Sequence, residues 1–363
     1  MATSEMIMKG NEVQNEKALS AKLISKRRLV TLPQWSVAWL VLIPTLIFLT
    51  MFMIYPIINT FLSAFIQNFS YQKGSGSFAI TNFLDSLRSG NEDEMAFGLS
   101  NFAGALRNKD FLQSVVNTAI LVIVEVPLTI MISLLIATFL NGIKVLKGFY
   151  QTIFFLPYVT NAIALGLVFN IVFTETSGGL MNILITKLGG QPINWLSFKN
   201  IEGQGSATRF HQGVVIVTYA IWNGLAFKIL VFMSGLATID SQYYNAAKID
   251  GASKFTIWRR ITLPLLSPQI LYITITSFIG AFKMYTGVMS VYTKLPSQSI
   301  KSAYYFGGDL GLEWIPVVGW IYRTLDDDLL NPGIPSAASF ILLAIIMVIT
   351  AVQFAISKKR VHY

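Results

Sequence analysis

The chain of 363 residues has no cysteine and only two histidines, His211 and His362. Without cysteine there is no disulfide framework, no thiolate nucleophile and no cysteine-based metal site. Two histidines so far apart along the chain exclude a histidine metal cluster, so neither a metal nor a cofactor is expected. The sequence also lacks the Gly-x-x-x-x-Gly-Lys-Ser/Thr loop that cradles phosphates, so the chain does not itself hydrolyse ATP by that route.

Charge is scarce as well. Charged residues make up 12% of the chain and hydrophobic residues 53%, whereas an average soluble domain carries about 25% charged residues. Stretches long enough to cross a hydrocarbon core of roughly 30 Å occur six times. The sequence therefore predicts an all-α membrane protein with a polar tail at 1–34 and a membrane domain at 35–363. The predicted spans lie near residues 35–65, 113–140, 149–174, 213–238, 269–291 and 335–356.

The basic residues are unevenly distributed among the connections. If the N-terminus is cytoplasmic, the segments 1–34, 141–148, 239–268 and 357–363 are inside and hold 15 Lys and Arg against 5 Asp and Glu. The outer loops hold 10 against 12. This asymmetry follows the positive-inside tendency, so the net charge of +9 indicates membrane orientation rather than nucleic-acid binding. We expect both termini in the cytoplasm. The long outer loops 67–112, 175–212 and 292–334 either meet an external protein or only cap the bundle and place aromatic residues at the membrane interface.

The inner connection 239–268 is too elaborate for a plain loop. It predicts two short helices joined by a sharp turn, which is typical of a docking element for another protein. Asp240 and Ser241 are residue types that cap a helix start, and Gly251 can adopt the left-handed conformation that ends one. Phe255 and Trp258 recur at three-residue spacing on the second helix, and we expect Pro264 to end that helix.

This connection resembles the coupling loop of ABC-importer permeases. Ala246, Ala247 and Gly251, followed by Ile261-x-Leu263-Pro264, fall at the family's spacing, while Asn245 stands where the family usually has Glu. An ordinary cytoplasmic loop helix is the alternative. The resemblance implies a docking surface for an ATPase that comprises Tyr244, Asn245, Ala246, Ala247, Asp250, Gly251, Ala252, Phe255 and Pro264.

A wider resemblance covers about residues 35–363. The segments Phe154–Tyr158, Gly179–Asn182 and Phe282–Lys283 are similar to those of carbohydrate-importer permeases of the maltose type, although 294–297 departs from the family pattern. The resemblance implies the type I ABC importer (MetI-like) permease fold in a bacterial cytoplasmic membrane. It also implies four kinds of partner: a homologous second permease, two cytoplasmic ATPase subunits, an external solute-binding protein and a sugar cargo. The chain would be a transport subunit, not an enzyme.

A sugar site needs amides or hydroxyls beside aromatic rings, and the spans offer both kinds of side chain. Helix–helix packing is the alternative role for each of them. Thr160, Asn170, Tyr219, Phe282 and Tyr285 are candidates of the right chemistry. By resemblance and by chemistry, the predicted substrate-binding residues are Tyr158, Asn161, Trp222, Asn223, Gly224, Phe227, Gly280, Ala281 and Met284.

Three ionisable side chains fall within the predicted spans: Glu125, Lys228 and Lys283. We expect them to be buried, where a charge at bilayer depth is a functional candidate. One hypothesis is a Glu125–Lys228 pair that holds spans two and four together; another is a lysine that meets an anionic sugar. The alternative functions are an ABC permease for glycerol phosphate or an acidic sugar and, with less support, an ion-coupled secondary transporter, which would favour internal repeats and paired carboxylates.

Overall fold

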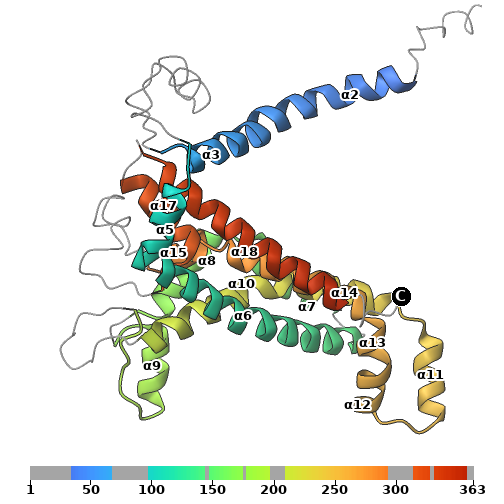
Figure 1. Ribbon diagram of the computed structural model, residues 1–363. Helices are drawn as coiled ribbons and strands as arrows, with labels where there is room; N and C mark the ends of the chain where they lie inside the picture. Colours follow the sequence, from blue (N-terminus) through green and yellow to red (C-terminus); the bar gives the residue numbers. More distant parts are fainter. Residues whose placement is uncertain are drawn as a thin grey trace, which may run out of the picture. The chain divides into compact units, whose positions relative to one another are not determined.

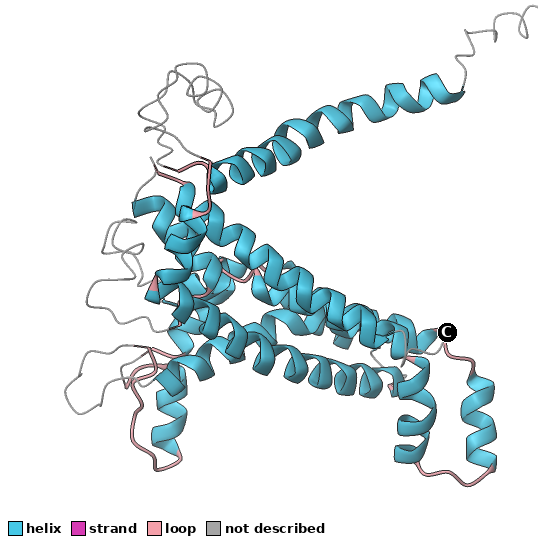
Figure 2. Cartoon of the chain, viewed as in Figure 1, coloured by secondary structure: helices cyan, strands magenta, loops and turns pink. Residues whose placement is uncertain are grey.

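The computed structural model describes residues 34–67, 97–143, 147–174, 177–196, 209–292, 314–327 and 331–357. Over these residues the regular structure is helical, as Figure 2 shows, apart from one isolated bridge between Ile66 and Phe97. The chain divides into two compact units, residues 1–59 and 60–363. The prediction of an all-α chain is confirmed for the described part.

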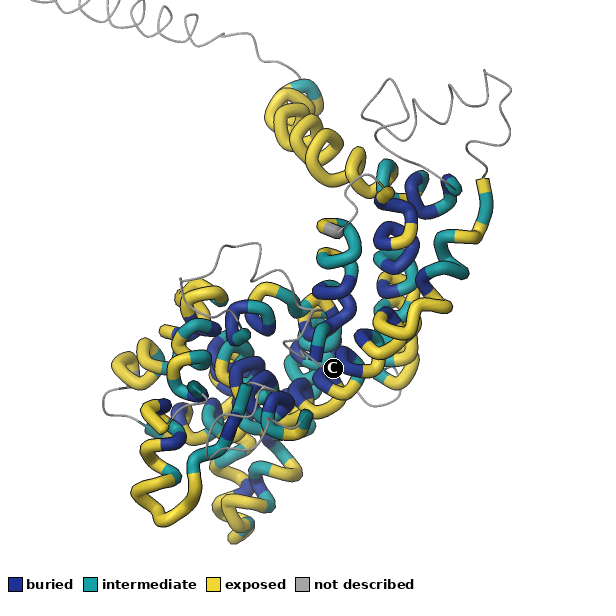
Figure 3. Tube along the Cα trace, turned by 90° about the vertical axis from the view of Figure 1, so that its left-hand side faces the viewer, coloured by how far each residue is buried: buried dark blue, intermediate teal, exposed yellow. Residues whose placement is uncertain are grey.

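The first unit contains α2 (Gln34–Leu49), the π-helical turn η1 (Thr50–Ile54) and the start of α3 (Tyr55–Phe65). Together they form a continuous helix over the first predicted span. Its residues up to Ile57 are almost all exposed, which the yellow tube of Figure 3 makes plain. Because these side chains are apolar, this surface suits lipid rather than water. The π turn was not predicted.

Three further predicted spans are single helices, each slightly longer than expected. They are α6 (Lys109–Gly142), α10 (Arg209–Ala237) and α18 (Gly333–Ser357). With the first span, the described residues contain four helices long and apolar enough to cross a membrane, and up to six if each of two bent helix pairs counts as one span.

The third predicted span is not one helix. It is broken into α7 (Lys147–Val159) and α8 (Ala162–Val172), whose axes differ by 98°. The break has a local cause, because the Asn161 side chain accepts a hydrogen bond from the Ile163 backbone N–H at 2.8 Å and so caps a new helix start. Asn161 is therefore a capping residue in this structure.

The fifth predicted span is also interrupted. Helix α14 (Ser267–Phe282) ends in the middle of it, and α15 (Thr286–Tyr292) follows after three residues. Lys283 occupies the C-cap of α14 and is exposed on this chain. The expectation that Lys283 is buried was wrong, since the helix ends there and turns the side chain away from the packed interior.

The core of the second unit lies along α6. Towards its N-terminal half, Phe111, Val122 and Val126 pack against α14, α18 and α17 (Val317–Asp327). Towards its C-terminal half, Leu134 and Ala137 pack against α10 and the start of α14. Helix α6 thus contributes to both clusters of buried apolar side chains. Its buried polar side chains therefore lie near the centre of the second unit.

Short helices mark the two ends of this unit. Helices α5 (Ser100–Arg107), α9 (Leu180–Lys187) and α17 come from the three predicted outer loops, and Figure 1 shows all of them at one end. The connection 239–268 forms α11 (Ser241–Ile249), α12 (Lys254–Ile257), η2 (Trp258–Thr262) and α13 (Leu263–Leu265) at the opposite end. The predicted outer and inner connections are therefore separated by the length of α6. The tail 1–33 and the outer-loop residues 68–96, 175–176, 197–208, 293–313 and 328–330 lie outside the described residues.

Candidate functional site

The turn within the connection 239–268 is built by backbone and side-chain caps. The Asp240 side chain accepts a hydrogen bond from the Gln242 N–H at 2.9 Å, which caps the start of α11. At the other end Gly251 has φ +72°, a left-handed conformation that disfavours a side chain. The Ala252 N–H donates to the Ala247 carbonyl and the Gly251 N–H to the Lys248 carbonyl, which is the Schellman pattern of a helix end. The predicted caps Asp240 and Gly251 are confirmed, whereas Ser241 is the first residue of α11 and does not cap it.

The prediction that Pro264 ends the second helix was wrong. Helical structure continues through α13 and the direction changes at Leu266, where the segment Lys254–Leu265 meets α14 at 67°. The π turn η2 precedes the proline, and Pro264 then occupies one of the first two positions of α13. Since a proline in a first helical turn removes no needed donor, the chain accommodates it without a stop.

Exposed apolar side chains gather on this helical pair, which we call the coupling hairpin (residues 239–266). The exposed fraction is 87% for Ile249, 65% for Phe255 and 57% for Tyr243. Large exposed apolar side chains grouped together indicate a surface that another protein covers. Of the predicted docking residues, Asn245, Ala246, Asp250, Gly251 and Phe255 are exposed, while Tyr244, Ala252 and Pro264 are intermediate and Ala247 is buried. Ile249 and Tyr243 were missed, although both flank the predicted motif.

Two side-chain contacts hold the hairpin together and to the rest of the unit. The Tyr244 and Thr262 hydroxyls lie 3.3 Å apart and tie α11 to η2. The Trp258 Nε1–H donates to the Thr138 hydroxyl on α6 at 3.4 Å. The hairpin is therefore in direct contact with a long helix of the core.

A cavity of about 570 Å³ opens in the middle of the second unit. Its wall combines residues from α6, α7, α8, α10, α14 and α15 with the breaks that follow α7 and α14. The lining residues are Glu125, Tyr158, Thr160, Ala162, Tyr219, Ala220, Asn223, Gly224, Phe227, Lys228, Thr276, Ser277, Gly280, Ala281, Met284, Tyr285, Thr286 and Gly287.

The structure brings most of the predicted substrate-binding residues into this one wall. Tyr158, Asn223, Gly224, Phe227, Gly280, Ala281 and Met284 all line the cavity. Asn161 and Trp222 do not; Asn161 caps α8, and Trp222 is exposed on the outside of α10. Among the other candidates, Asn170 donates to the Val291 carbonyl at 2.6 Å and so joins α8 to α15 away from the cavity.

Aromatic rings provide the flat surfaces of the cavity. The rings of Tyr158 and Phe227 stack with centroids 5.8 Å apart, and the ring of Tyr285 stacks on that of Tyr322 at 4.6 Å. Hydroxyls and one amide lie beside them, from Thr276, Ser277 and Asn223. Thr276, Ser277 and Thr286 were missed because a single hydroxyl within an apolar run gives no sequence signal beyond its own polarity.

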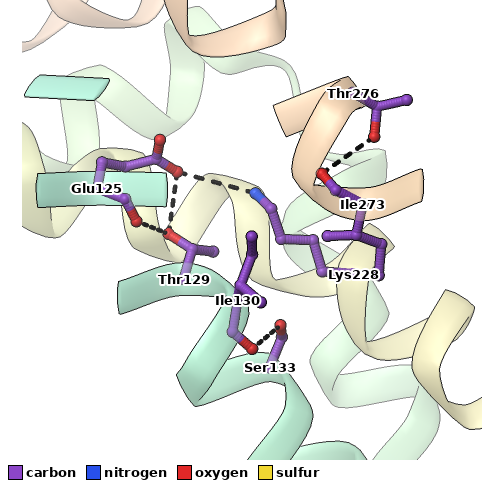
Figure 4. Close-up of polar contacts among 7 residues, drawn as sticks. All are labelled: Glu125, Thr129, Ile130, Ser133, Lys228, Ile273 and Thr276. Carbon is purple, nitrogen blue, oxygen red and sulfur yellow. Dashed lines mark hydrogen bonds and ion pairs between the residues drawn. The ribbon is translucent and has the colours of Figure 1, made fainter. Parts of the chain in front are cut away.

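Two opposite charges belong to the same wall. Lys228 Nζ on α10 lies 3.8 Å from Glu125 Oε1 on α6, and Figure 4 shows the two side chains pointing toward each other. The Thr129 hydroxyl lies 2.9 Å from the same carboxylate oxygen. The hypothesis that Glu125 and Lys228 pair between spans two and four is confirmed.

Residues 96–362 match the family described as binding-protein-dependent transport system inner membrane component. The chain belongs to this family. It is therefore the inner membrane component of a binding-protein-dependent transport system, a permease. The match starts shortly before α5 and includes the coupling hairpin and the cavity, so both sites lie within the part of the chain that the family matches.

Curated relatives match the permease over most of their length. The arabinooligosaccharides transport system permease protein AraP of Bacillus subtilis (strain 168) is 28% identical over 323 residues, covering 86% of each chain. The lactose transport system permease protein LacF of Rhizobium radiobacter is 25% identical and covers 89% of this chain and 94% of its own. The sn-glycerol-3-phosphate transport system permease protein UgpA of Agrobacterium fabrum is 27% identical over 269 residues, with 73% of this chain and 82% of its own covered.

Solved structures give the fold. A chain of the bacterial alginate ABC transporter, in complex with an alginate pentasaccharide-bound periplasmic protein, superposes on the permease with a TM-score of 0.67. The identity is 17%, and the match covers 89% of this chain and 94% of that chain. At that identity the likeness carries the fold and no statement about cargo. The resemblance to ABC-importer permeases is thereby confirmed at the level of architecture.

Proposed function

We propose that the permease is a subunit of an ATP-driven importer that translocates a sugar or oligosaccharide, delivered by an external solute-binding protein. One observation carries this proposal: the cavity places stacked aromatic rings beside hydroxyls and an amide, with Tyr158, Phe227 and Asn223 in one wall. A sugar presents apolar C–H faces to such rings and hydroxyls to such polar groups. Relatives named for arabinooligosaccharide and lactose transport support the same class of cargo.

The proposed topology has six spans with both termini in the cytoplasm. The bent pair α7–α8 then counts as one span, α14 and α15 together form another, and the coupling hairpin, which includes Lys254–Leu265, lies on the cytoplasmic side. There its exposed apolar residues, Tyr243, Ile249 and Phe255, would be covered by one of two ATPase subunits. The contacts Tyr244–Thr262 and Trp258–Thr138 would carry closure of the ATPases into α6, and a homologous second permease would complete the pathway.

Uptake by the reconstituted importer tests the function. The permease is purified with its partners, placed in proteoliposomes with ATP inside, and offered radiolabelled sugars of graded length together with the solute-binding protein. ATP-dependent accumulation of at least one sugar is expected. A matched preparation with Phe227→Ala, which removes one ring of the stack, should accumulate that sugar more slowly while its partners remain bound. If amino acids or inorganic ions are accumulated and no sugar is, the proposal fails.

A second candidate is import of glycerol phosphate or an acidic sugar. One observation favours it, the ammonium group of Lys228 in the cavity wall, and the relative named for glycerol-3-phosphate transport agrees with it. The same uptake assay distinguishes the two, because glycerol 3-phosphate and oligogalacturonate can be included among the labelled compounds.

A further inference from the structure

The two charges in the cavity wall are close without being in hydrogen-bonding contact. Lys228 Nζ and Glu125 Oε1 are 3.8 Å apart, whereas a hydrogen bond between an ammonium and a carboxylate spans about 2.7–2.9 Å. Among the described residues, the Thr129 hydroxyl is the hydrogen-bond donor to this carboxylate. An ammonium has three N–H donors, and a carboxylate accepts at about four positions. Both groups therefore retain unused hydrogen-bonding capacity.

A glycine determines where the ammonium lies. Gly224 is one helical turn before Lys228 on α10, and a Cβ atom at Gly224 would lie 2.7 Å from Lys228 Nζ and 3.4 Å from Glu125 Oε1. The lysine side chain thus turns back along its own helix into the space that the missing side chain leaves. Gly224, Glu125 and Lys228 all line the cavity, and the two charged side chains keep exposed fractions of 6% and 9%. The pair is thus largely buried between α6 and α10, and only a small part of each side chain reaches the cavity.

We propose that Glu125 and Lys228 form a subsite for a neutral hydroxyl of the cargo and make the cavity selective against anions. An oxygen atom can lie about 2.8 Å from both charged atoms at their present separation. A hydroxyl group is donor and acceptor at once, so it accepts from Lys228 and donates to Glu125. This inference rests on the proposed sugar import and narrows it to uncharged sugars.

An anionic group fits the same place poorly. A carboxylate or phosphate of the cargo would accept from Lys228, but it would also approach Glu125, whose like charge opposes it in a region of low dielectric. Among the residues that line the cavity, Glu125 and Lys228 are the acid and the base, so no further cation in that lining offsets the repulsion. The alternative is that the pair acts only as a strut between α6 and α10.

Direct binding to the assembled importer in lipid nanodiscs tests the subsite. Saturation-transfer NMR detects weak sugar binding; the neutral probes are lactose, maltotriose and raffinose, and the anionic probes are trigalacturonate and glycerol 3-phosphate. The wild-type importer is expected to bind a neutral probe at least about tenfold more tightly than either anionic probe. Glu125→Gln should weaken the binding of the neutral probe and strengthen the binding of the anionic probes, so that the preference is reversed. Lys228→Met should weaken neutral and anionic probes alike by about tenfold or more, the size expected for a lost hydrogen bond to a charged group.

Two further variants separate selectivity from folding. Each single substitution leaves a charge without its partner, so the double variant Glu125→Gln/Lys228→Met is measured as well; it should bind neutral and anionic probes weakly and with little preference. Lys187→Met removes an exposed lysine on α9 and should keep the wild-type preference. If every variant at Glu125 and Lys228 keeps the wild-type ratio of neutral to anionic binding, the pair is a strut and the inference is wrong, while sugar import stands. If the wild type binds none of the sugars, the proposed function and the subsite fail together.

Discussion

The coupling hairpin and the cavity are organised in opposite ways. In the hairpin, the hydrogen bonds that define the turn join residues at most five positions apart, as in Ala252–Ala247 and Gln242–Asp240, and the Tyr244–Thr262 contact between its arms spans 18 positions. In the cavity, the contacts join distant segments, as in the pair of Glu125 with Lys228 and the stack of Tyr158 on Phe227. The hairpin can therefore retain its shape while it moves, whereas the shape of the cavity depends on the relative positions of the long helices. A transport component needs both properties, because a rigid element must drive a change in a site assembled from several helices.

The largest effect is expected when one charge is removed from the cavity. Glu125→Leu leaves the Lys228 ammonium without its partner, and removal of one member of a buried pair costs about 3–5 kcal/mol. The apparent melting temperature of the purified permease should fall by many degrees, as measured by intrinsic fluorescence. The double variant Glu125→Leu/Lys228→Leu should recover most of the loss. Equal stability of Glu125→Leu and wild type would mean that the pair does not stabilise the cavity.

A substitution at Gly251 tests whether the hairpin is a local unit that is independent of the cavity. Gly251→Ala places a side chain at φ +72°, and the left-handed conformation costs an ordinary residue roughly 1–2 kcal/mol. Amide hydrogen exchange of α11 should become faster, while the cavity residues keep their protection. Gly251→Asn should be milder, since asparagine tolerates this conformation. A change spread evenly over both sites would show that the hairpin is not an independent local unit.

A substitution at Asp240, the N-cap of α11, is expected to have a smaller effect that is confined to the hairpin. Asp240→Ala removes the acceptor of the Gln242 N–H, and loss of such a cap costs about 1 kcal/mol. Hydrogen exchange at the first turn of α11 should accelerate, and ATP-driven uptake should fall only slightly. Asp240→Ser retains a capping oxygen and serves as the matched control. Unchanged exchange in Asp240→Ala would rule out a role for the cap.

The smallest effect on the fold is expected at Phe255, which is exposed on the hairpin. Phe255→Ala should alter stability by less than about 0.5 kcal/mol, as surface substitutions usually do. It should nevertheless reduce recovery of the ATPase subunits when the permease is purified by an affinity tag, because the docking surface loses a large apolar side chain. The exposed Lys254→Ala, beside it, is the control. Full recovery with Phe255→Ala would remove this residue from the proposed docking surface.

The sequence predicted helices and caps well where the signals were local. Asp240 and Gly251 were enough to predict the turn of the hairpin, and long apolar runs were enough to predict the helices α6, α10 and α18. It failed at Pro264, because a π turn before the proline changed the hydrogen-bonding register, and at Lys283, where a helix ends within an apolar run. Neither feature leaves a mark on hydropathy, so no windowed pattern could have found it.

The cavity shows most clearly which residues could be predicted from the sequence and which required the tertiary structure. Motif resemblance placed Tyr158, Asn223 and Gly280 in one wall, and all three line the cavity. Side-chain chemistry alone added Asn161 and Trp222, which do not line it, and did not single out Thr276 and Ser277, which do. Hydrophobicity alone made this chain a bundle of apolar helices, because unpaired backbone groups cannot remain in a hydrocarbon core. What only the tertiary structure decided is which faces of those helices meet. Each polar residue has one direction in space, and that direction depends on the bend after α7, on the end of α14 and on the packing of α10 against α6.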